Sequence, residues 1–267
     1  MFFDIFQYDF MIRGLAAGLI VGLVAPLIGV FLVLRRYSLI ADTLSHVSLA
    51  GIALGLIFGI NPVFAALGTT VLAALGLEKL RVSRRLYNES ALALFLSGSL
   101  ALAVVLLSLA HGFNSNLFSY LFGSIVTVTR SDVSVMAGLA LVVVATLALF
   151  FKEIVFITFD EEAARVSGLP VRLVNTIFIV LAALTISLAI PIIGVLLIAA
   201  LIVIPAVTAL QLRRRLLPTI IFAEIFSLVS VLAGLLLAFY FNLATGGTIV
   251  LVMILIFIAV FILRPRA

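Results

Sequence analysis

Long apolar runs fill this chain, and short clusters of polar and charged residues separate them. Most runs come close to the ~20 residues that an α-helix needs to cross the hydrocarbon core of a bilayer. Strict alternation of apolar and polar positions is absent, which argues against a membrane-spanning β-barrel. The pattern therefore predicts an all-α, polytopic bundle of about nine membrane-spanning helices.

The predicted spans end at basic clusters, prolines or short polar segments. A further segment, 117–125, is too short to cross and predicts a short interfacial helix that ends near Gly123. The expected spans are 14–34, 39–60, a third that ends near Leu80, 91–110, 133–151, 173–190, 192–212, 217–241 and 248–263.

Composition agrees with a membrane protein: 66% of the residues are hydrophobic, 10% are charged, and the mean hydropathy is +1.46. We expect a single transmembrane domain over residues 1–267, in a multi-pass protein of a prokaryotic cell membrane. Cysteine is absent, which excludes thiolate metal sites and disulfides. Neither lysine follows a glycine, so the chain lacks the phosphate-binding loop of an ATPase and has no nucleotide-binding domain.

Positive charge predicts the orientation of the bundle. The net charge of +5 comes from basic clusters between apolar runs, which indicates membrane topology rather than nucleic-acid binding. With the N-terminus outside and the C-terminus in the cytoplasm, fourteen of the sixteen Lys and Arg fall on the cytoplasmic side, and only Arg13 and Arg130 lie outside. The fourteen are Arg35, Arg36, Lys79, Arg81, Arg84, Arg85, Lys152, Arg165, Arg172, Arg213, Arg214, Arg215, Arg264 and Arg266.

The second predicted span carries Asp42 and His46, which are four residues apart and therefore share one face of a helix. Ser38 and Ser45 fall close to that face. Ionisable groups inside a membrane usually face a protein interior or a water-filled path. Carboxylate oxygen and neutral imidazole are both good zinc ligands, so the pair is a candidate contact for a cation in transit. The alternative is that the two side chains bond to each other or to the backbone and hold a helix break.

The connection after the fifth span predicts a short helix with a cap at each end. Asp160, Glu161 and Glu162 would occupy its first turn, where carboxylates suit the helix dipole, and Ala163 would continue it. Gly168 is placed to follow its C-cap, and Pro170 prevents extension. Such a rigid element could dock a cytoplasmic partner or simply close a loop.

Two further polar residues, Glu224 and His111, are considered as contacts for a cation. Glu224, inside the eighth span, could line a path, but snorkelling or pairing with Arg213–Arg215 is the simpler interpretation. His111 is expected to be interfacial rather than a ligand.

Four ordered segments resemble the zinc, manganese and iron group of ABC-importer permeases, nearly end to end. They are RRYSLIADTLSHVSLAG (35–51), NLFSYLFGSIVTV (116–128), TFDEEAARVSGLPVR (158–172) and IGVLLIAALIVIPAVTA (193–209). The Asp-Thr-Leu-Ser-His-Val-Ser version and the Phe-Asp-Glu-Glu segment look most like the zinc-importing branch. Manganese relatives tend to have Gly-Asp-Ala-Ile-Ser-His-Ala-Val-Leu-Pro, where this chain has Ala41 and Ala50 in place of the Gly and Pro.

The resemblance implies a type II-like permease that works as two identical copies in the lipid bilayer, with cytoplasmic ABC ATPase subunits and an extracellular metal-binding protein. Asp42 and His46 match the positions that would contact the metal. Residues 160–168 would be the helix that couples to the ATPase. The segment with Leu117, Tyr120, Phe122 and Gly123 would help to gate the path.

Three functions follow as hypotheses. The first is the permease subunit of an ATP-driven divalent-metal importer, most plausibly for zinc, with manganese or iron as alternative cargoes. Zinc is then transported rather than held as a permanent cofactor, and ATP hydrolysis belongs to a separate chain. The second is a secondary metal transporter or channel that needs no motor. The third is a membrane scaffold in which the polar stripe is incidental.

Overall fold

The computed structural model of the chain describes residues 8–83, 88–109 and 115–263, and in those ranges every regular element is a helix. The expected all-α fold is confirmed. The helices are α1 (Asp9–Leu34), α2 (Ser38–Phe58), α3 (Pro62–Ser83), α4 (Asn88–Leu109), α5 (Ser115–Phe122), α6 (Arg130–Leu149), α7 (Phe151–Phe159), α8 (Glu161–Val166), α9 (Val171–Ile193), α10 (Ile198–Leu210), α11 (Leu216–Phe241) and α12 (Thr245–Leu263).

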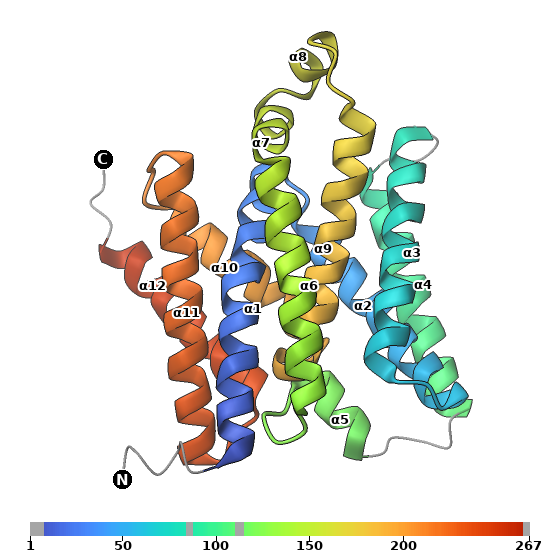
Figure 1. Cartoon of the computed structure of the whole chain (residues 1–267), viewed down its shortest axis with the longest axis vertical. Helices are drawn as coiled ribbons and strands as arrows, with labels where there is room; N and C mark the ends of the chain where they lie inside the picture. The colour runs from blue at the N-terminus through green and yellow to red at the C-terminus, as the bar shows by residue number, and fades with distance from the viewer. Residues whose placement is uncertain (1–7, 84–87, 110–114, 264–267) are drawn as a thin grey trace.

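Eight of the described helices are long and apolar enough to cross a membrane: α1 to α4, α6, α9, α11 and α12. Helix α10 is apolar but shorter than these eight. The long helices lie roughly side by side, with α5 at one end of the bundle and α8 at the opposite end (Figure 1). About nine spans were expected from the sequence; the described residues contain eight long apolar helices, and the shorter α10 lies where the seventh expected span, 192–212, was placed.

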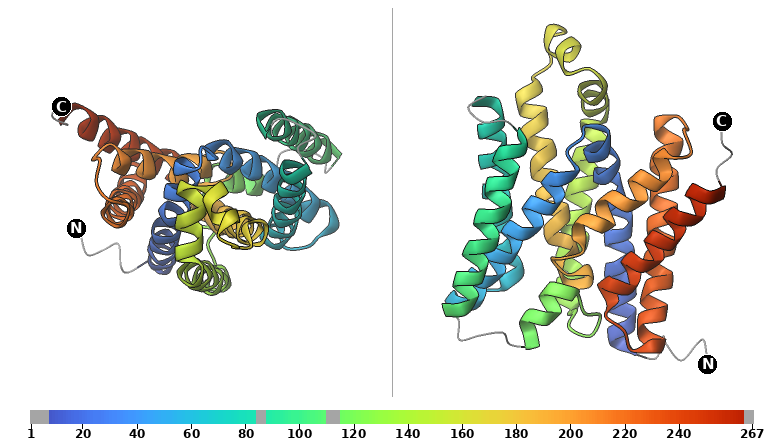
Figure 2. Two further views of the ribbon diagram at one scale, coloured as in Figure 1. Left: turned by 90° about the horizontal axis from the view of Figure 1, so that it is seen from above. Right: turned by 180° about the vertical axis from the view of Figure 1, so that it is seen from behind.

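Three groups of helices make up the bundle. Helices α1 and α9 form its centre with α6 packed against both from outside, α11 and α12 lie on one side, and α2 to α4 lie on the other (Figures 1 and 2). Burial separates core helices from peripheral ones. In the most apolar stretch of each helix, 78% of the residues are buried in α9 and 72% in α2, against 11% in α4 and 17% in α6. Most residues of α4 and α6 are therefore left exposed by the rest of the chain.

Small residues bring neighbouring helices into close contact. A Cβ added at Gly51 of α2 would lie 2.6 Å from the Cα of Ala66 in α3. A Cβ at Gly234 of α11 would lie 2.6 Å from the Cα of Ile249 in α12. Inside a bilayer, lipid tails are as apolar as leucine, so close backbone packing of this kind contributes much of the helix association.

The break between α1 and α2 falls at Arg35-Arg36, as the polar cluster predicted. Arg36 takes a left-handed conformation with φ of +59°. The N–H of Arg36 donates to Val33 O (3.0 Å) and that of Tyr37 to Leu32 O (2.7 Å), which is the Schellman pattern that ends a helix. Tyr37 is then the N-cap of α2. The chain turns sharply there, and α2 begins next to the end of α1.

The seventh expected span, 192–212, is interrupted in the structure. Helix α9 continues through Pro191 to Ile193, residues 194–197 form a turn, and α10 begins at Ile198. Gly194 stands in the turn with φ of +80°, a conformation that glycine adopts at little cost. The sequence is apolar on both sides of the turn, so hydrophobicity alone could not locate the break.

Candidate functional site

Asp42 and His46 lie in the second and third turns of α2, near the end of the bundle that carries α8. The Nε2 atom of His46 is 3.7 Å from Oδ1 of Asp42. That separation exceeds hydrogen-bonding distance, so the two side chains are neighbours without a direct hydrogen bond. The other ring nitrogen of His46, Nδ1, is buried and has no hydrogen-bond partner among the described residues.

The pair occupies the uncovered face of α2. From Ile40 to Ala53, every residue other than Asp42 and His46 is buried by the chain's own helices. The Asp42 side chain keeps 44% of its exposure and that of His46 keeps 18%. Lipid contact is costly for ionisable groups at membrane depth. This face therefore suits contact with a water-filled passage or with another protein.

Asp42 and His46 are the two candidate ligands that the sequence predicted at this face. Among the described residues, no group of three or more His, Cys, Asp or Glu side chains is close enough to hold a metal ion. Ser45, which the sequence placed close to the pair, is 1% exposed, and its Oγ donates to Ala41 O (2.7 Å). Ser45 points into the bundle because it falls to the side of the exposed stripe, so its hydroxyl is not part of the pair's face.

Helix α8 has the two caps that the sequence predicted. The side chain of Asp160 accepts from the N–H of Ala163 (2.8 Å), and Glu161 and Glu162 occupy the first turn. At the other end Gly168 has φ of +83°, and the N–H of Leu169 donates to Ala164 O (3.2 Å). Ala164 is buried, whereas Val166 is 89% exposed. The helix is therefore a rigid projection whose outer face is free in this chain.

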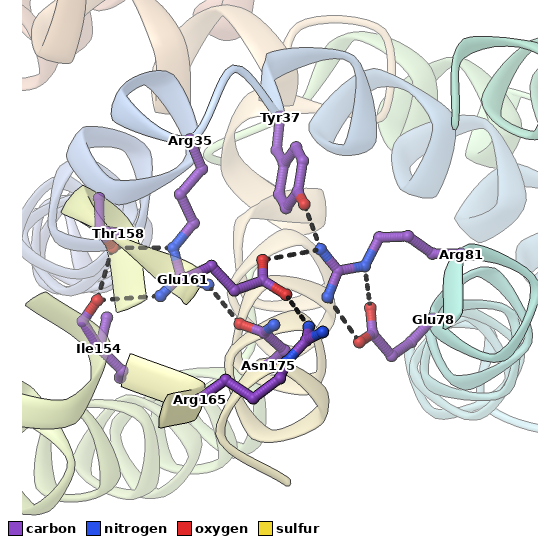
Figure 3. Close-up of polar contacts among 9 residues, drawn as sticks. All are labelled: Arg35, Tyr37, Glu78, Arg81, Ile154, Thr158, Glu161, Arg165 and Asn175. Atoms are coloured by element: carbon purple, nitrogen blue, oxygen red, sulfur yellow. Dashed lines mark hydrogen bonds and ion pairs between the residues drawn. The ribbon is translucent and has the colours of Figure 1, made fainter. Parts of the chain in front are cut away.

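A network of polar side chains, shown in Figure 3, lies beneath α8. Arg35, which caps α1, donates to Thr158 Oγ1 (2.8 Å), Asn175 Oδ1 (2.8 Å) and Ile154 O (3.0 Å). Its guanidinium also stacks 4.5 Å above the ring of Phe178. Burial lowers the pKa of Arg35 to about 10, so the group stays charged at neutral pH. These contacts fix the end of α1 to α7 and α9.

Arg81 is the second centre of that network. Its Nε and Nη2 donate to the two carboxylate oxygens of Glu78 at 2.8 Å each. Its Nη1 donates to the hydroxyl of Tyr37 and lies 3.9 Å from Oε2 of Glu161. From the sequence, Arg35 and Arg81 were expected only to lie on the cytoplasmic side of the membrane, and this network was not predicted. The Glu78/Arg81 spacing of three residues was the one local signal for part of it.

The short helix α5 ends as expected, with Gly123 at φ of +75°. Backbone hydrogen bonds hold its last turn to the break between α9 and α10: Val195 N donates to Tyr120 O (2.9 Å) and Leu196 N to Leu121 O (3.3 Å). Phe122 is partly exposed and stacks on Phe118, with ring centroids 6.3 Å apart. For Leu117 the structure describes only the helical backbone.

A polar hollow of about 230 Å³ opens beside α5. Tyr120 lines it together with Asn61, Thr127 and Asp132. Of the four residues that the sequence linked to gating, Tyr120 therefore borders a hollow. Helix α5, which carries Tyr120, lies at the end of the bundle opposite α8 (Figure 1).

Comparison with known proteins identifies the chain. The model of the ABC 3 transport family matches residues 7–264, nearly the full length. The chain belongs to the ABC 3 transport family. It is 37% identical over 254 residues to the "Probable metal transport system membrane protein" of Treponema pallidum, covering 95% of each chain. It is 34% identical to the manganese transport system membrane protein MntC of Listeria monocytogenes, covering 97% of this chain and 92% of that one.

Two further similarities complete this comparison. The ABC 3 chain is 29% identical to the high-affinity zinc uptake system membrane protein ZnuB of Haemophilus influenzae, over 97% of this chain and all of that one. The structure of PsaBC from Streptococcus pneumoniae in complex with Fab superposes with a TM-score of 0.88 at 29% identity, covering 100% of this chain and 97% of that one.

The predicted group, the membrane permeases of metal ABC transporters, is confirmed for this ABC 3 protein. It is a multi-pass permease of the cell membrane and, like its relatives, not itself an enzyme. The zinc branch is not singled out, because relatives named for manganese and for zinc both match nearly end to end.

Glu224 and His111 are the two remaining polar residues for which the sequence led to an expectation. Among the described residues, Glu224 of this permease forms no ion pair with Arg213–Arg215, so the expected pairing is not seen, and snorkelling stays a prediction. His111 lies outside the described residues.

Proposed function

We propose that this ABC 3 permease forms the membrane path of an importer for a divalent transition-metal ion, and that Asp42 and His46 contact the ion in transit. The observation that carries the proposal is the uncovered pair on α2, the only break in an otherwise buried stretch from Ile40 to Ala53. A carboxylate oxygen and an imidazole nitrogen are a fitting donor set for such an ion. Two ligands hold a metal weakly, which suits a path that must release it.

A second copy of the chain would complete the site. If two permeases pack about a two-fold axis with their α2 faces opposed, each contributes the same two side chains. The result is two oxygen and two nitrogen donors, a set that a tetrahedral zinc ion accepts. The 44% exposure of the Asp42 side chain leaves room for this approach. We infer that the working permease is a homodimer with Asp42 and His46 at its centre.

The energy source in this proposal is a separate ATPase that docks on α8. The capped helix projects from the cytoplasmic end with Val166 at its exposed tip. Residues Asp160 to Gly168 would enter a groove of the ATPase. An extracellular metal-binding protein would deliver the ion at the α5 end, where Tyr120 borders the polar hollow.

Zinc is our first candidate cargo, because the residues around Asp42 and His46 match the zinc-importing version of the motif. Manganese is the second candidate, and the similarity to MntC of Listeria monocytogenes favours it. The donor set permits both, since imidazole also suits manganese moderately.

Reconstitution in liposomes with the cognate ATPase and binding protein tests the proposal. We expect ATP-dependent uptake of zinc or manganese, with Asp42→Asn and His46→Ala abolishing uptake while the complex still assembles and hydrolyses ATP. Ser45→Ala is the matched control on the same helix, because its hydroxyl bonds only the backbone. Normal uptake in both ligand variants would remove the pair from the mechanism. Uptake by the permease alone, without ATP, would favour a motor-independent transporter.

A further inference from the structure

One guanidinium joins the projecting helix α8 to the start of the helix that carries the candidate metal pair. Arg81, in the last turns of α3, holds Glu78 of its own helix through two hydrogen bonds of 2.8 Å. The same group reaches the hydroxyl of Tyr37, the N-cap of α2, and lies 5.4 Å from the centre of its ring. Its Nη1 also lies 3.9 Å from Oε2 of Glu161, the first residue of α8 (Figure 3).

The contacts of Arg81 with Glu78 and with Glu161 differ in length and in solvent exposure. The Arg81–Glu78 pair is bidentate, and the Glu78 side chain is only 5% exposed, so this pair is part of the fold. The Arg81–Glu161 contact is longer, and the Glu161 side chain is 38% exposed. A long, partly exposed ion pair is weak and is lost at little cost. Glu161 can therefore leave Arg81 without disturbing the pair with Glu78.

The surroundings give Glu161 room to move. A hollow of about 870 Å³ lies at this end of the bundle, lined by Tyr37, Arg81, Glu161 and Arg165 among others. The other oxygen of Glu161 accepts from Arg165 Nη2 at 3.0 Å, within α8 itself. When α8 shifts, Glu161 therefore moves with Arg165 and approaches or leaves Arg81.

The neighbouring end of α1 is anchored instead. Arg35 is fixed to α7 and α9 by three hydrogen bonds and a ring contact. Two residues later, the hydroxyl of Tyr37 accepts from Arg81, while the backbone N–H of Tyr37 donates to Leu32 O of α1 (2.7 Å). A change at Arg81 therefore acts on the first turn of α2 through the side chain of its N-cap, Tyr37.

We infer that Arg81 is a positioning residue that transmits the movement of α8 to α2, through a detachable contact with Glu161 and a lasting contact with Tyr37. Asp42 follows Tyr37 by little more than one turn, so a shift of the α2 N-cap changes the direction of the Asp42/His46 pair. The inference rests on the proposed function, because it assigns α8 to an ATPase and the pair to a metal.

The test measures metal uptake and ATP hydrolysis in the same proteoliposomes, with permease, ATPase and binding protein present. Glu161→Gln removes the negative charge of the carboxylate. Arg81→Lys keeps the positive charge but loses the planar guanidinium that reaches Glu78, Tyr37 and Glu161. Because Glu161 lies in the docking helix, the amount of bound ATPase is measured for each variant, and uptake is expressed per ATP hydrolysed. For each single variant we expect the metal moved per ATP to fall about fivefold or more. The double variant should fall no further than Arg81→Lys alone, because Arg81→Lys already loses the contact with Glu161.

Arg130→Gln is the matched control, because Arg130 forms a comparable ion pair with Asp9 (3.3 Å) at the opposite end of the bundle. Its uptake per ATP should equal that of the unchanged protein. If Glu161→Gln only weakens ATPase binding and Arg81→Lys is normal, Glu161 is a docking residue and the inference is wrong. An additive loss in the double variant would also overturn it. Failure of the unchanged complex to transport metal would instead overturn the proposed function.

If Arg81→Lys does not fold, Glu161→Gln decides the matter together with a distance measurement. The chain has no cysteine, so spin labels can be placed at Val166→Cys on α8 and Phe58→Cys at the far end of α2, both on exposed side chains. We expect nucleotide to change this distance in the complex and Glu161→Gln to remove the change. An unaltered change would overturn the inference.

Discussion

The Nε2 atom of His46 lies 3.7 Å from the Oδ1 atom of Asp42, on the one face of α2 that the rest of the chain leaves uncovered. A carboxylate and an imidazole at this distance form no hydrogen bond with each other, so both can contact one ion. The chemistry of the pair should therefore decide which ion the permease prefers.

Exchanging the imidazole for a second carboxylate should shift that preference. His46→Asp leaves two oxygen donors, which suit manganese better than zinc. We expect zinc uptake to fall relative to manganese uptake, measured by competition between the two ions in cells that lack other importers. His46→Gln, a neutral oxygen donor, serves as the control for loss of the ring. An unchanged zinc-to-manganese ratio would show that selectivity is set elsewhere.

Single cysteines should report the orientation of the bundle in the membrane. A membrane-impermeant thiol reagent added outside should leave Val166→Cys unlabelled and should label Phe118→Cys; both side chains are exposed, at 89% and 53%. The expectation follows from the basic clusters, which gather at the α8 end. The parent chain has no cysteine and is the blank. Labelling of Val166→Cys in sealed cells would invert the proposed topology.

The cap of α8 depends on the backbone of Gly168. Alanine there meets open space but must hold φ near +83°, which costs about 1 kcal/mol for an L-residue. We expect Gly168→Ala to loosen α8 and weaken co-purification of the ATPase. Gly138→Ala in α6 also meets open space but needs no positive φ, and it should have no effect. Equal binding by both variants would contradict the docking role of α8.

The contact of α5 with the turn between α9 and α10 should be disrupted by a side chain at Gly194. A Cβ there would collide with the backbone of Leu121 and Gly123, in addition to the strain of φ at +80°. We expect Gly194→Ala to destabilise the detergent-purified permease by about 3 kcal/mol. Gly59→Ala is the control, because Gly59 has φ of +65° with nothing nearby, and should cost about 1 kcal/mol. Similar midpoints of thermal unfolding in the two variants would show that α5 is not held by this contact.

Local features of this protein could be predicted from its sequence. Helix length, the break at Arg35-Arg36, the caps at Asp160 and Gly168 and the shared face of Asp42 and His46 all depend on residues within a few positions of one another. Such short-range rules act before any helix meets its neighbours. The resemblance to metal permeases rests on the same local segments.

The tertiary structure alone decided which faces meet. A helix that is apolar all round carries no periodic signal for its rotation, so the burial of Ser45 and the exposure of Asp42 could not be read from the sequence. The break after Ile193 is likewise hidden in apolar sequence and is stabilised by α5, about seventy residues earlier. The contact between Arg81 and Glu161 joins two helices that are remote in the chain and meet only when the bundle is packed.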